Sequence, residues 1–292
     1  MNVHAIINPT AGGGYSAEIY PTIMSQLRRL NITHSMTTKP GDAEQMAQKA
    51  VSDGVDYLFC IGGDGTLNEV VQALQNSDTV LVPISGGTGS DFVKTLGYRD
   101  MQYVLEAVES GNIIKVDLGV VQSDLGKRFF INILEVGFGA KVMKRVNSRR
   151  KIRGGASFTS SVLATLPTFR PYRVRMILPN ADMTDSVAEI VVANGRYFGG
   201  GMLAAPSAEL TDGLLDIHVV QGMNLFRMMA KLRKLRDGSY VDDPAVRSYR
   251  ADSVHFIGDA PVEIDGEDYG QLPVMVSAEK LALKVLAPSN EK

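Results

Sequence analysis

One stretch constrains the fold more than any other: a continuous apolar run that leads into a glycine-rich turn. Residues Val55–Ile61 are apolar almost throughout and are followed directly by Gly62-Gly63-Asp64-Gly65-Thr66. A strand that is apolar on both faces is typical of a parallel sheet covered by helices. Glycines let the backbone approach a phosphate, and the free N–H groups at the start of a following helix favour an anion. The stretch therefore predicts an α/β domain that binds phosphate, although a tight turn that merely needs small residues would look similar.

Strands and helices alternate along the first third of the chain, which predicts a doubly wound α/β domain. The expected strands are Val3–Ile7, Val55–Ile61 and Thr79–Ile84. The expected helices begin at residues whose side chains can cap them, namely Ser16, Asp42 with Gln45, Thr66 with Glu69, and Asp100.

After about Ile113 the pattern changes to short β-rich runs separated by turn residues, which predicts a mainly antiparallel β-sandwich or barrel. The runs are Ile113–Val121, Arg128–Leu134, Val174–Leu178, Val187–Ala193, Leu214–Val220, Val254–Ile257, Val262–Ile264 and Leu281–Leu286. Two helices are expected within this part, near Ala140–Val146 and over Asn224–Arg236. We place the first domain at residues 1–122 and the second at 123–280, with 281–292 as a C-terminal strand that is free to return to the first domain.

Composition narrows the function classes. The net charge of −2 gives no basic excess of the kind that duplex nucleic-acid binders carry, so no nucleic-acid partner is expected. The single cysteine, Cys60, cannot form an internal disulfide, which favours a reducing, cytoplasmic setting. No stretch reaches the roughly 18–20 apolar residues that span a bilayer, so we expect any membrane contact to be peripheral.

Further motifs extend over nearly the whole chain. They are Asn8-Pro9-Thr10-Ala11-Gly12-Gly13, Thr37 with Gly41-Asp42-Ala43, residues 83–92, residues 194–216 and Asp265-Gly266-Glu267. Together with the glycine-rich turn they resemble, in order, the motifs of the diacylglycerol kinase catalytic-domain family, which is related to sphingosine kinases. The turn alone also resembles those of phosphofructokinases and NAD kinases. An NAD kinase is disfavoured because the chain lacks that family's second Asn-Glu pair and its TxTGSTAY-like run.

The resemblance implies ATP and Mg²⁺ as cofactors and a set of residues that contact them. The implied nucleotide contacts are Asn8, Pro9, Thr10, Ala11, Gly12, Thr37, Gly63, Asp64, Gly65, Thr66, Leu67, Asn68, Glu69 and Thr88. Asp64 is also a catalytic candidate because its carboxylate can hold or orient Mg²⁺. Two departures from the family pattern, Ser90 in place of the usual Asn and an extra glycine within 85–88, are expected to affect nucleotide geometry and not the fold.

The resemblance also implies a catalytic segment in the second domain. In the family the carboxylates of this motif serve the attacking hydroxyl, so Asp265 and Glu267 are the candidates for the proton acceptor. An ordinary Asp-Gly turn is the alternative interpretation. Catalysis by these residues requires the two domains to meet. Glu209, Asp212 and the Leu214 carbonyl resemble a structural Mg²⁺ loop of bacterial members, with a plain turn as the alternative.

The expected activity is that of an ATP-dependent lipid kinase acting on the primary hydroxyl of diacylglycerol. Phosphatidylglycerol, monoacylglycerol, ceramide and sphingoid bases offer the same chemistry, and a catalytically weak nucleotide- or lipid-binding regulator is the alternative from another class. Basic clusters within 145–153 and 224–236 are compatible with contact to anionic lipid or with solvated helix ends. The expected partner is thus a lipid at the membrane surface, the expected location is cytoplasmic and peripheral to the membrane, and a homodimer is left open.

Overall fold

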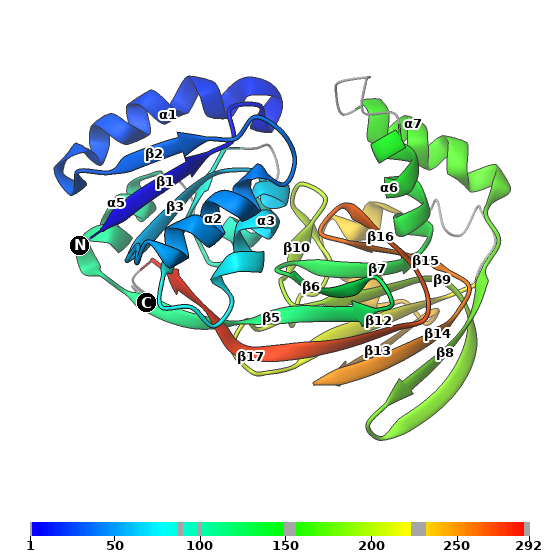
Figure 1. The fold of residues 1–292 in the computed structure, drawn as a ribbon. Helices are drawn as coiled ribbons and strands as arrows, with labels where there is room; N and C mark the ends of the chain where they lie inside the picture. The colour runs from blue at the N-terminus through cyan, green and yellow to red at the C-terminus, as the bar shows by residue number, and fades with distance from the viewer. Residues whose placement is uncertain (1, 87–89, 99–100, 149–155, 223–231, 289–292) are drawn as a thin grey trace. The chain divides into compact units, whose positions relative to one another are not determined.

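The computed structural model describes residues 2–86, 90–98, 101–148, 156–222 and 232–288. The chain forms two compact units (Figure 1). The first contains residues 1–118 together with 280–292, and the second contains residues 119–279. The division thus falls at residue 118 where the sequence pattern placed it at 122, and the last segment of the chain is part of the first unit.

The first unit is built on a parallel sheet in the order β2-β1-β3-β4, with the end of β17 added next to β4. The strands are β1 (Val3–Ile7), β2 (Thr33–Met36), β3 (Tyr57–Gly62), β4 (Val80–Ser85) and β17 (Val274–Leu286). The helices are α1 (Tyr15–Gln26), α2 (Asp42–Ser52), α3 (Asp64–Leu74), α4 (Asp91–Thr95) and α5 (Met101–Ser110), with short 3₁₀ turns at Ala11–Gly14 and Arg28–Leu30. This arrangement confirms the predicted doubly wound α/β class.

The strand order locates the binding edge of this sheet. From β1 the chain moves to β2 on one side, and it then returns to place β3 on the other side of β1. The order therefore reverses between β1 and β3. Ligands of doubly wound sheets bind at the carboxyl ends of the strands beside such a switch point. Asn8 follows the end of β1, and the glycine-rich turn follows the end of β3.

The predicted helix caps at Ser16 and Asp42 are wrong because these side chains have other partners. Ser16 lies inside α1, is fully buried, and donates its hydroxyl to the carbonyl of Gly86 at 2.8 Å. Asp42 turns back to the preceding loop, where one carboxylate oxygen accepts the N–H and the hydroxyl of Thr38 at 2.8 and 2.7 Å. The Thr38 hydroxyl bond holds the pKa of Asp42 below its ordinary value. Asp100 lies outside the described residues.

The second unit is antiparallel and confirms the predicted sandwich-like class. Its main strand order is β16-β15-β7-β9-β8-β14-β17, with β12 paired to β9 and β13, and β6 to β5. The bounds are β5 (Ile113–Ser123), β6 (Gly126–Phe130), β7 (Ile133–Gly137), β8 (Tyr172–Leu178), β9 (Ala181–Ala193), β12 (Leu215–Gln221), β13 (Val246–Ala251), β14 (Ser253–Gly258), β15 (Pro261–Ile264) and β16 (Glu267–Gln271). A separate two-residue pair joins β10 (Tyr197–Phe198) to β11 (Met202–Leu203), and the helices are α6 (Phe138–Ser148) and α7 (Ala156–Thr165), followed by 3₁₀ turns at Leu166–Thr168, Leu232–Leu235 and Ser239–Asp242.

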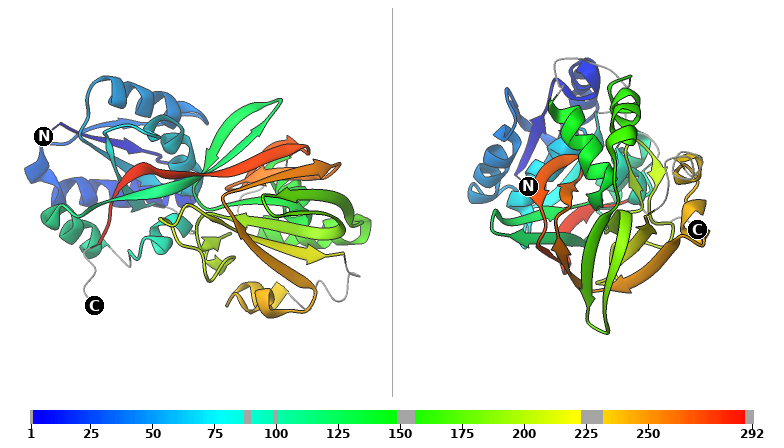
Figure 2. Two further views of the ribbon diagram at one scale, coloured as in Figure 1. Left: turned by 90° about the horizontal axis from the view of Figure 1, so that it is seen from below. Right: turned by 90° about the vertical axis from the view of Figure 1, so that its right-hand side faces the viewer.

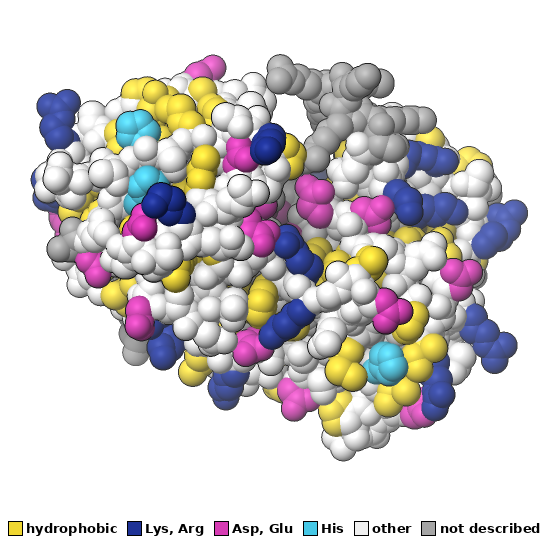
Figure 3. Space-filling model, viewed as in Figure 1, with side chains coloured by type: hydrophobic (Ala, Val, Ile, Leu, Met, Phe, Trp, Pro, Cys, Tyr) yellow, Lys and Arg dark blue, Asp and Glu magenta, His cyan; other side chains and the backbone are white. Residues whose placement is uncertain are grey.

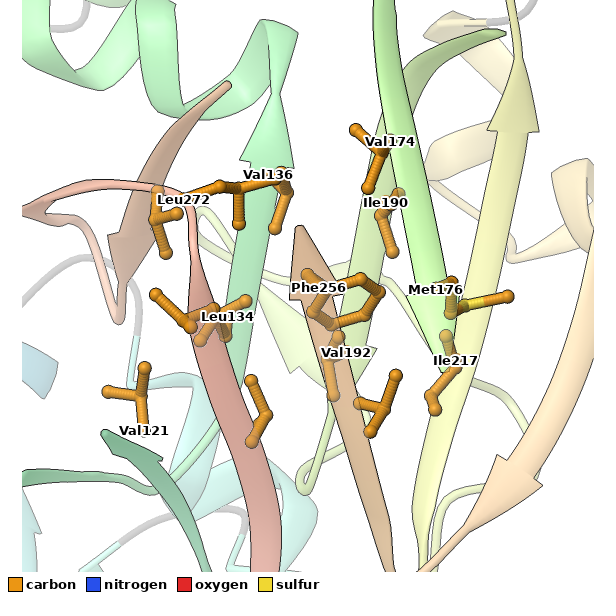
Figure 4. Close-up of a cluster of buried hydrophobic side chains, with 14 of the residues drawn as sticks. Val121, Leu134, Val136, Val174, Met176, Ile190, Val192, Ile217, Phe256 and Leu272 are labelled. Atoms are coloured by element: carbon orange, nitrogen blue, oxygen red, sulfur yellow. The ribbon is translucent and has the colours of Figure 1, made fainter. Parts of the chain in front are cut away.

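Alternation along the strands separates an apolar face from a polar one. Leu134 and Val136 point into the main core with Phe256 and residues of the neighbouring strands (Figure 4). Glu135, between them on β7, points to the opposite side of the sheet. That opposite side is where α6 packs, because α6 contacts β7, β9, β15 and β16.

Two strands join the units. β5 starts in the first unit and ends in the second, whereas β17 starts in the second and ends in the first (Figures 1 and 2). The second unit is therefore one continuous segment of the chain, enclosed between two parts of the first. The predicted helix over Asn224–Arg236 lies largely outside the described residues, which resume with the 3₁₀ turn at Leu232–Leu235.

Candidate functional site

The glycine-rich turn combines one glycine required by packing with two that leave open space. A Cβ atom on Gly62 would lie 2.7 Å from the Cβ of Thr66, which is too close for any side chain. At Gly63 and Gly65 an added Cβ would meet nothing within 4 Å. The turn opens into α3, whose first N–H groups have no partner within the helix. The geometry thus provides a bare helix start at the carboxyl edge of the sheet, which suits a phosphate.

Asn8 ties the end of β1 to this turn. Its side-chain amide donates to the Thr66 hydroxyl at 2.9 Å, and its Oδ1 atom accepts the N–H and the hydroxyl of Thr10 at 3.1 and 2.9 Å. Its own N–H donates to the carbonyl of Ile61 at the end of β3. The predicted nucleotide residues from two distant segments are therefore brought together at the switch point.

The loop after Asn8 follows the same edge. Pro9, Thr10, Ala11 and Gly12 form the turn into α1, and Gly12 and Gly13 have left-handed φ angles of 61° and 72° that favour glycine. Thr37 lies at the end of β2, is buried, and donates its N–H to the carbonyl of Ile7. Thr88 lies outside the described residues.

Asp64 has a structural partner that the sequence did not indicate. Its two carboxylate oxygens accept the N–H groups of Asp91 and Phe92, at 3.1 and 3.2 Å, and so hold the start of α4. The residue before α4 is Ser90, which has a φ of 52° and hydrogen-bonds to Ser85. Asn adopts left-handed φ more readily than Ser, which gives a physical reason for the Asn that the family uses at this position.

Glu69 links α3 to α2, and the predicted Thr66–Glu69 capping box is wrong. The Glu69 carboxylate accepts the N–H of Gly41 at 3.0 Å and that of Ala43 at 3.1 Å, at the beginning of α2. Leu67 and Asn68 are buried within α3.

In the second unit the Asp-Gly-Glu segment is a two-residue β-hairpin turn. Ile264 pairs with Glu267 across β15 and β16, and Asp265 and Gly266 have φ angles of 46° and 91°. Positive φ at both central residues defines the type I′ turn, for which Asp-Gly is a preferred sequence. The turn interpretation is therefore correct, and the position of the carboxylates decides whether the segment does more.

The two carboxylates of this turn differ in their surroundings. Asp265 accepts the N–H groups of Ile131, Asn132 and Ile133 at 2.8, 2.9 and 3.0 Å. These bonds end β6 and separate it from β7, which is why the predicted single strand Arg128–Leu134 is wrong. Glu267 is the first residue of β16 and is exposed. Asp265 is thus committed to the backbone, whereas Glu267 presents its carboxylate at the surface of the turn.

The peptide groups of Gly266 are held on both sides. Its N–H donates to the Oε2 atom of Glu263 at 2.7 Å, and its carbonyl accepts the side-chain amide of Asn147, on α6, at 3.1 Å. Glu263 in turn faces Glu135, its register partner on β7, with the two carboxyl groups within hydrogen-bonding reach. Sequence reasoning did not identify Glu263 or Glu135, because each occurs alone within an apolar strand.

The predicted Mg²⁺ loop holds an internal cation instead. The Oδ1 atom of Asp212 accepts the N–H of Leu214 at 2.9 Å, and its Oδ2 atom pairs with the guanidinium of Arg250. Glu209 is exposed. Within the described ranges, no group of three or more His, Cys, Asp or Glu side chains is arranged to hold a metal ion. A divalent cation would have to displace Arg250, so these residues do not fit one as they stand.

Comparisons with known proteins cover both units. Residues 2–121 match the model described as a diacylglycerol kinase catalytic domain, and residues 132–287 match the YegS C-terminal NAD kinase beta sandwich-like domain. The chain is 30% identical over 297 residues to a protein named diacylglycerol kinase from Mycobacterium tuberculosis, covering 98% of this chain and 95% of that protein. It is 29% identical to "Probable lipid kinase YegS" from Salmonella arizonae, covering 80% and 78%. A crystal structure of a diacylglycerol kinase from Bacillus anthracis superimposes with a TM-score of 0.73 at 22% identity, over 99% of this chain and 97% of that one, which shows the shared fold.

Proposed function

The chain belongs to the diacylglycerol kinase catalytic-domain family and is a lipid kinase, and from that premise we propose that it transfers the γ-phosphoryl group of ATP to the primary hydroxyl of diacylglycerol. The observation that carries the proposal is the bare start of α3 at the switch point of the parallel sheet. It offers the anion site that a nucleotide phosphate needs. Diacylglycerol is favoured among lipid alcohols because the Mycobacterium tuberculosis relative, similar over almost its whole length, carries that name.

The first unit supplies the positioning that phosphoryl transfer requires. Gly63 and Gly65 leave room for phosphate oxygens, while Asn8 and Thr66 fix the turn against β1. Mg²⁺ bound with the nucleotide would neutralise developing charge on the phosphates. Asp64 is the residue that would hold or orient that ion, because carboxylate oxygens are ligands that Mg²⁺ prefers. Its bonds to the start of α4 fix its orientation.

The second unit supplies the group that accepts the proton of the lipid hydroxyl. We assign this role to Glu267. Asp265 accepts three backbone N–H groups, and taking up a proton would cost it part of that network. Glu267 lies at the exposed end of a turn whose backbone is fixed on both sides. A fixed base is worth more in the transition state than a mobile one.

The decisive experiment measures transfer from γ-labelled ATP to a panel of lipids in mixed micelles. The panel contains diacylglycerol, monoacylglycerol, phosphatidylglycerol, ceramide and a sphingoid base. Turnover that is highest with diacylglycerol supports the proposal, and a preference for another member moves the substrate assignment. Saturable binding of ATP and lipid without turnover would favour the alternative, a nucleotide- or lipid-binding regulator.

The same proposal places the enzyme at a membrane surface, at the cytoplasmic side where ATP is supplied. No helix in the described part of the chain has the length and apolar character needed to cross a bilayer. Lys and Arg side chains gather along the edge of the second unit on the face shown in Figure 3. Cationic side chains near a surface are attracted to anionic headgroups, which supports peripheral association. Of the basic clusters noted in the sequence at 145–153 and 224–236, residues 149–153 and 224–231 lie outside the described residues.

A further inference from the structure

Three glutamates, two of them buried and one half-buried, form a cluster behind the Asp-Gly-Glu turn. Glu135 and Glu263 are 7% and 1% exposed and occupy opposite positions on β7 and β15. Glu189, on β9, joins them on the side of the sheet that α6 covers. A β-bulge in β9 near Glu189, beside Gly137 of β7, shifts the local register. Bulges of this kind re-aim side chains next to active sites.

The hydrogen bonds of this cluster require a proton. An ionised carboxylate only accepts hydrogen bonds, so two carboxyl groups bond to each other only when one of them is protonated. Glu135 and Glu263 face each other from register positions on β7 and β15, with their carboxyl groups within hydrogen-bonding reach, while Glu263 also accepts the N–H of Gly266 at 2.7 Å. A proton on either carboxyl group satisfies the pair. When Glu263 carries it, its carbonyl oxygen accepts the Gly266 N–H and its O–H donates to Glu135.

The cluster is tied to both ends of α6. Glu189 accepts the N–H of Gly139, at the start of the helix, at 2.5 Å. Near the other end, Asn147 donates to the carbonyl of Gly266. An added Cβ on Gly139 would lie 2.5 Å from Glu135, so the helix start packs directly on the carboxyl groups. The turn and the helix are therefore held by one set of side chains.

We propose that Glu263, kept protonated by its bond to Glu135, is a positioning residue that fixes the Gly266 peptide and thereby aims Glu267 at the substrate hydroxyl. The proposal rests on the function proposed above, which makes Glu267 the base. Loss of the shared proton would leave two facing carboxylates, which repel each other and release Gly266. The proton acts as part of the framework of the site and takes no part in the transfer itself.

The surroundings agree with a retained proton. Burial, together with the charges of Glu135 and Asp265, raises the pKa of Glu263 well above its ordinary value. Burial likewise raises the pKa of Glu135, and burial with the Glu135 charge raises that of Glu189. Burial with the charges of Glu135 and Glu189 raises the pKa of Tyr240, and burial with the charge of Glu189 raises that of Tyr172, so both phenols lie near the cluster. The packed elements also carry these charged side chains: Lys141, Lys144 (paired with Asp268) and Arg145 (bonded to Thr165) on α6, and Glu267 and Asp268 on β16.

Glu263→Gln is the sharpest test because the amide reproduces the neutral acid. Its oxygen accepts the Gly266 N–H and its NH₂ donates to Glu135, yet it cannot lose a proton near neutral pH. We expect kcat to equal that of wild type at neutral pH. Above the folded pKa of the cluster, wild-type kcat should fall by about tenfold per pH unit, while the variant stays flat. Glu279→Gln, at a partly exposed ion-pair residue of the same unit, should keep the wild-type profile.

The variant Glu263→Met distinguishes an effect on the position of Glu267 from an effect on ATP binding. It keeps the volume but offers no acceptor, so kcat should fall at least tenfold while the KM for ATP is unchanged, and Gln at the same position should restore kcat. A wild-type alkaline fall in Glu263→Gln, or full kcat in Glu263→Met, would overturn the proposal.

A spectroscopic measurement is independent of turnover. Difference infrared spectra of the full chain should show the carbonyl stretch of a protonated carboxylic acid at neutral pH, and Glu263→Gln should lose it while Glu279→Gln keeps it. If the wild type lacks that band, no protonated carboxyl group is present and the proposal fails, whatever the variants show. If no lipid is phosphorylated but the band is present and assigned, the proposed function fails and the buried proton stands.

Discussion

Arg250, on β13, pairs its guanidinium with the carboxylate of Asp212, in the turn that precedes β12. Its Nε atom lies 3.4 Å from the carboxylate of Asp216, which is buried at the start of β12. One cation of the chain thus pairs with a carboxylate of the loop and with one of β12, at the place where the family resemblance implied a bound metal ion. The loop has its positive charge built in.

Replacing Arg250 by Gln should make this loop depend on a divalent cation. The pair is partly exposed, so we expect a loss of only about 1 kcal/mol in the free energy of unfolding. Added Mg²⁺ should restore the Tm of the variant and leave that of the wild type unchanged. Arg247 lies on the same strand as Arg250 and forms an ion pair with Asp185 of β9. The variant Arg247→Gln breaks that pair and should show no response to Mg²⁺. A wild-type protein that is itself destabilised by a chelator would contradict this view of the loop.

Asp64→Asn and Asp64→Ala should both abolish turnover but differ in stability. Both remove the charge that would hold Mg²⁺. Asn keeps an oxygen that can accept an N–H at the start of α4, whereas Ala leaves Asp91 and Phe92 without that acceptor, as in the loss of a helix cap. We expect the Ala variant to lose about 1 kcal/mol more in urea unfolding. Normal turnover of the Asn variant, measured with labelled ATP, would refute the phosphate-site assignment.

Variants of Glu267 should lose kcat, whereas variants of Asp265 should lose folding stability. Glu267→Gln keeps the shape of the side chain and should lower kcat by about 10²–10⁴-fold, with little change in ATP affinity or in the Tm. Asp265→Asn weakens the acceptor of three backbone N–H groups and should cost about 2 kcal/mol of unfolding free energy. If Asp265→Asn alone removed activity without loss of stability, the roles would have to be exchanged.

The glutamate cluster predicts an unusual pH dependence of stability. The pKa of Glu263 is raised in the folded protein above the ordinary value of 4.5. Because the pKa is raised, the contribution of protonated Glu263 to the free energy of unfolding is complete below pH 4.5. It is lost as the pH rises toward the pKa of Glu263 in the folded protein. In that window the wild type should lose about 1.4 kcal/mol per pH unit relative to Glu263→Gln. Parallel urea titrations of the two proteins would measure this difference, and curves that stay parallel across the window would contradict it.

Peripheral membrane binding should depend on lipid charge. In flotation assays the chain should bind vesicles that contain anionic phospholipid more strongly than vesicles of phosphatidylcholine alone. Added salt should weaken the binding, because ions screen exposed charges beyond about 10 Å at 0.1 M. Binding that ignores both lipid charge and salt would remove the electrostatic part of the proposal.

The strands that sequence patterns missed share one property. β2, β10, β11, β13 and β16 are absent from the predicted runs, and each lies at an edge of its sheet. An edge strand is covered on fewer sides, so its residues need not be apolar, as Glu267–Gln271 shows. Apolar runs identified the central strands because only those strands must be buried on both faces.

The site was predictable where a motif is local and unpredictable where it depends on distant partners. The glycine-rich turn and Asn8 could be placed because each follows the carboxyl end of a strand. Spacing suggested that Glu69 caps its own helix, yet it bonds to Gly41 and Ala43 of another helix. Hydrogen bonds between segments far apart in the sequence leave no periodic signal, so only the folded chain reveals them.

The return of β17 to the first unit has a consequence for the order in which the protein can be completed. Val285 pairs with Leu81 of β4, and Leu283, Val285 and Leu286 are buried there. A chain emerging from the ribosome exposes most of the parallel sheet of the first unit early, but the last strand of that sheet is synthesised after the entire second unit. Domains generally fold as they emerge, N-terminal part first. Here the edge of β4 stays unpaired until β17 has been synthesised. A chain truncated near its C-terminus would therefore lack a strand of the unit that was made first.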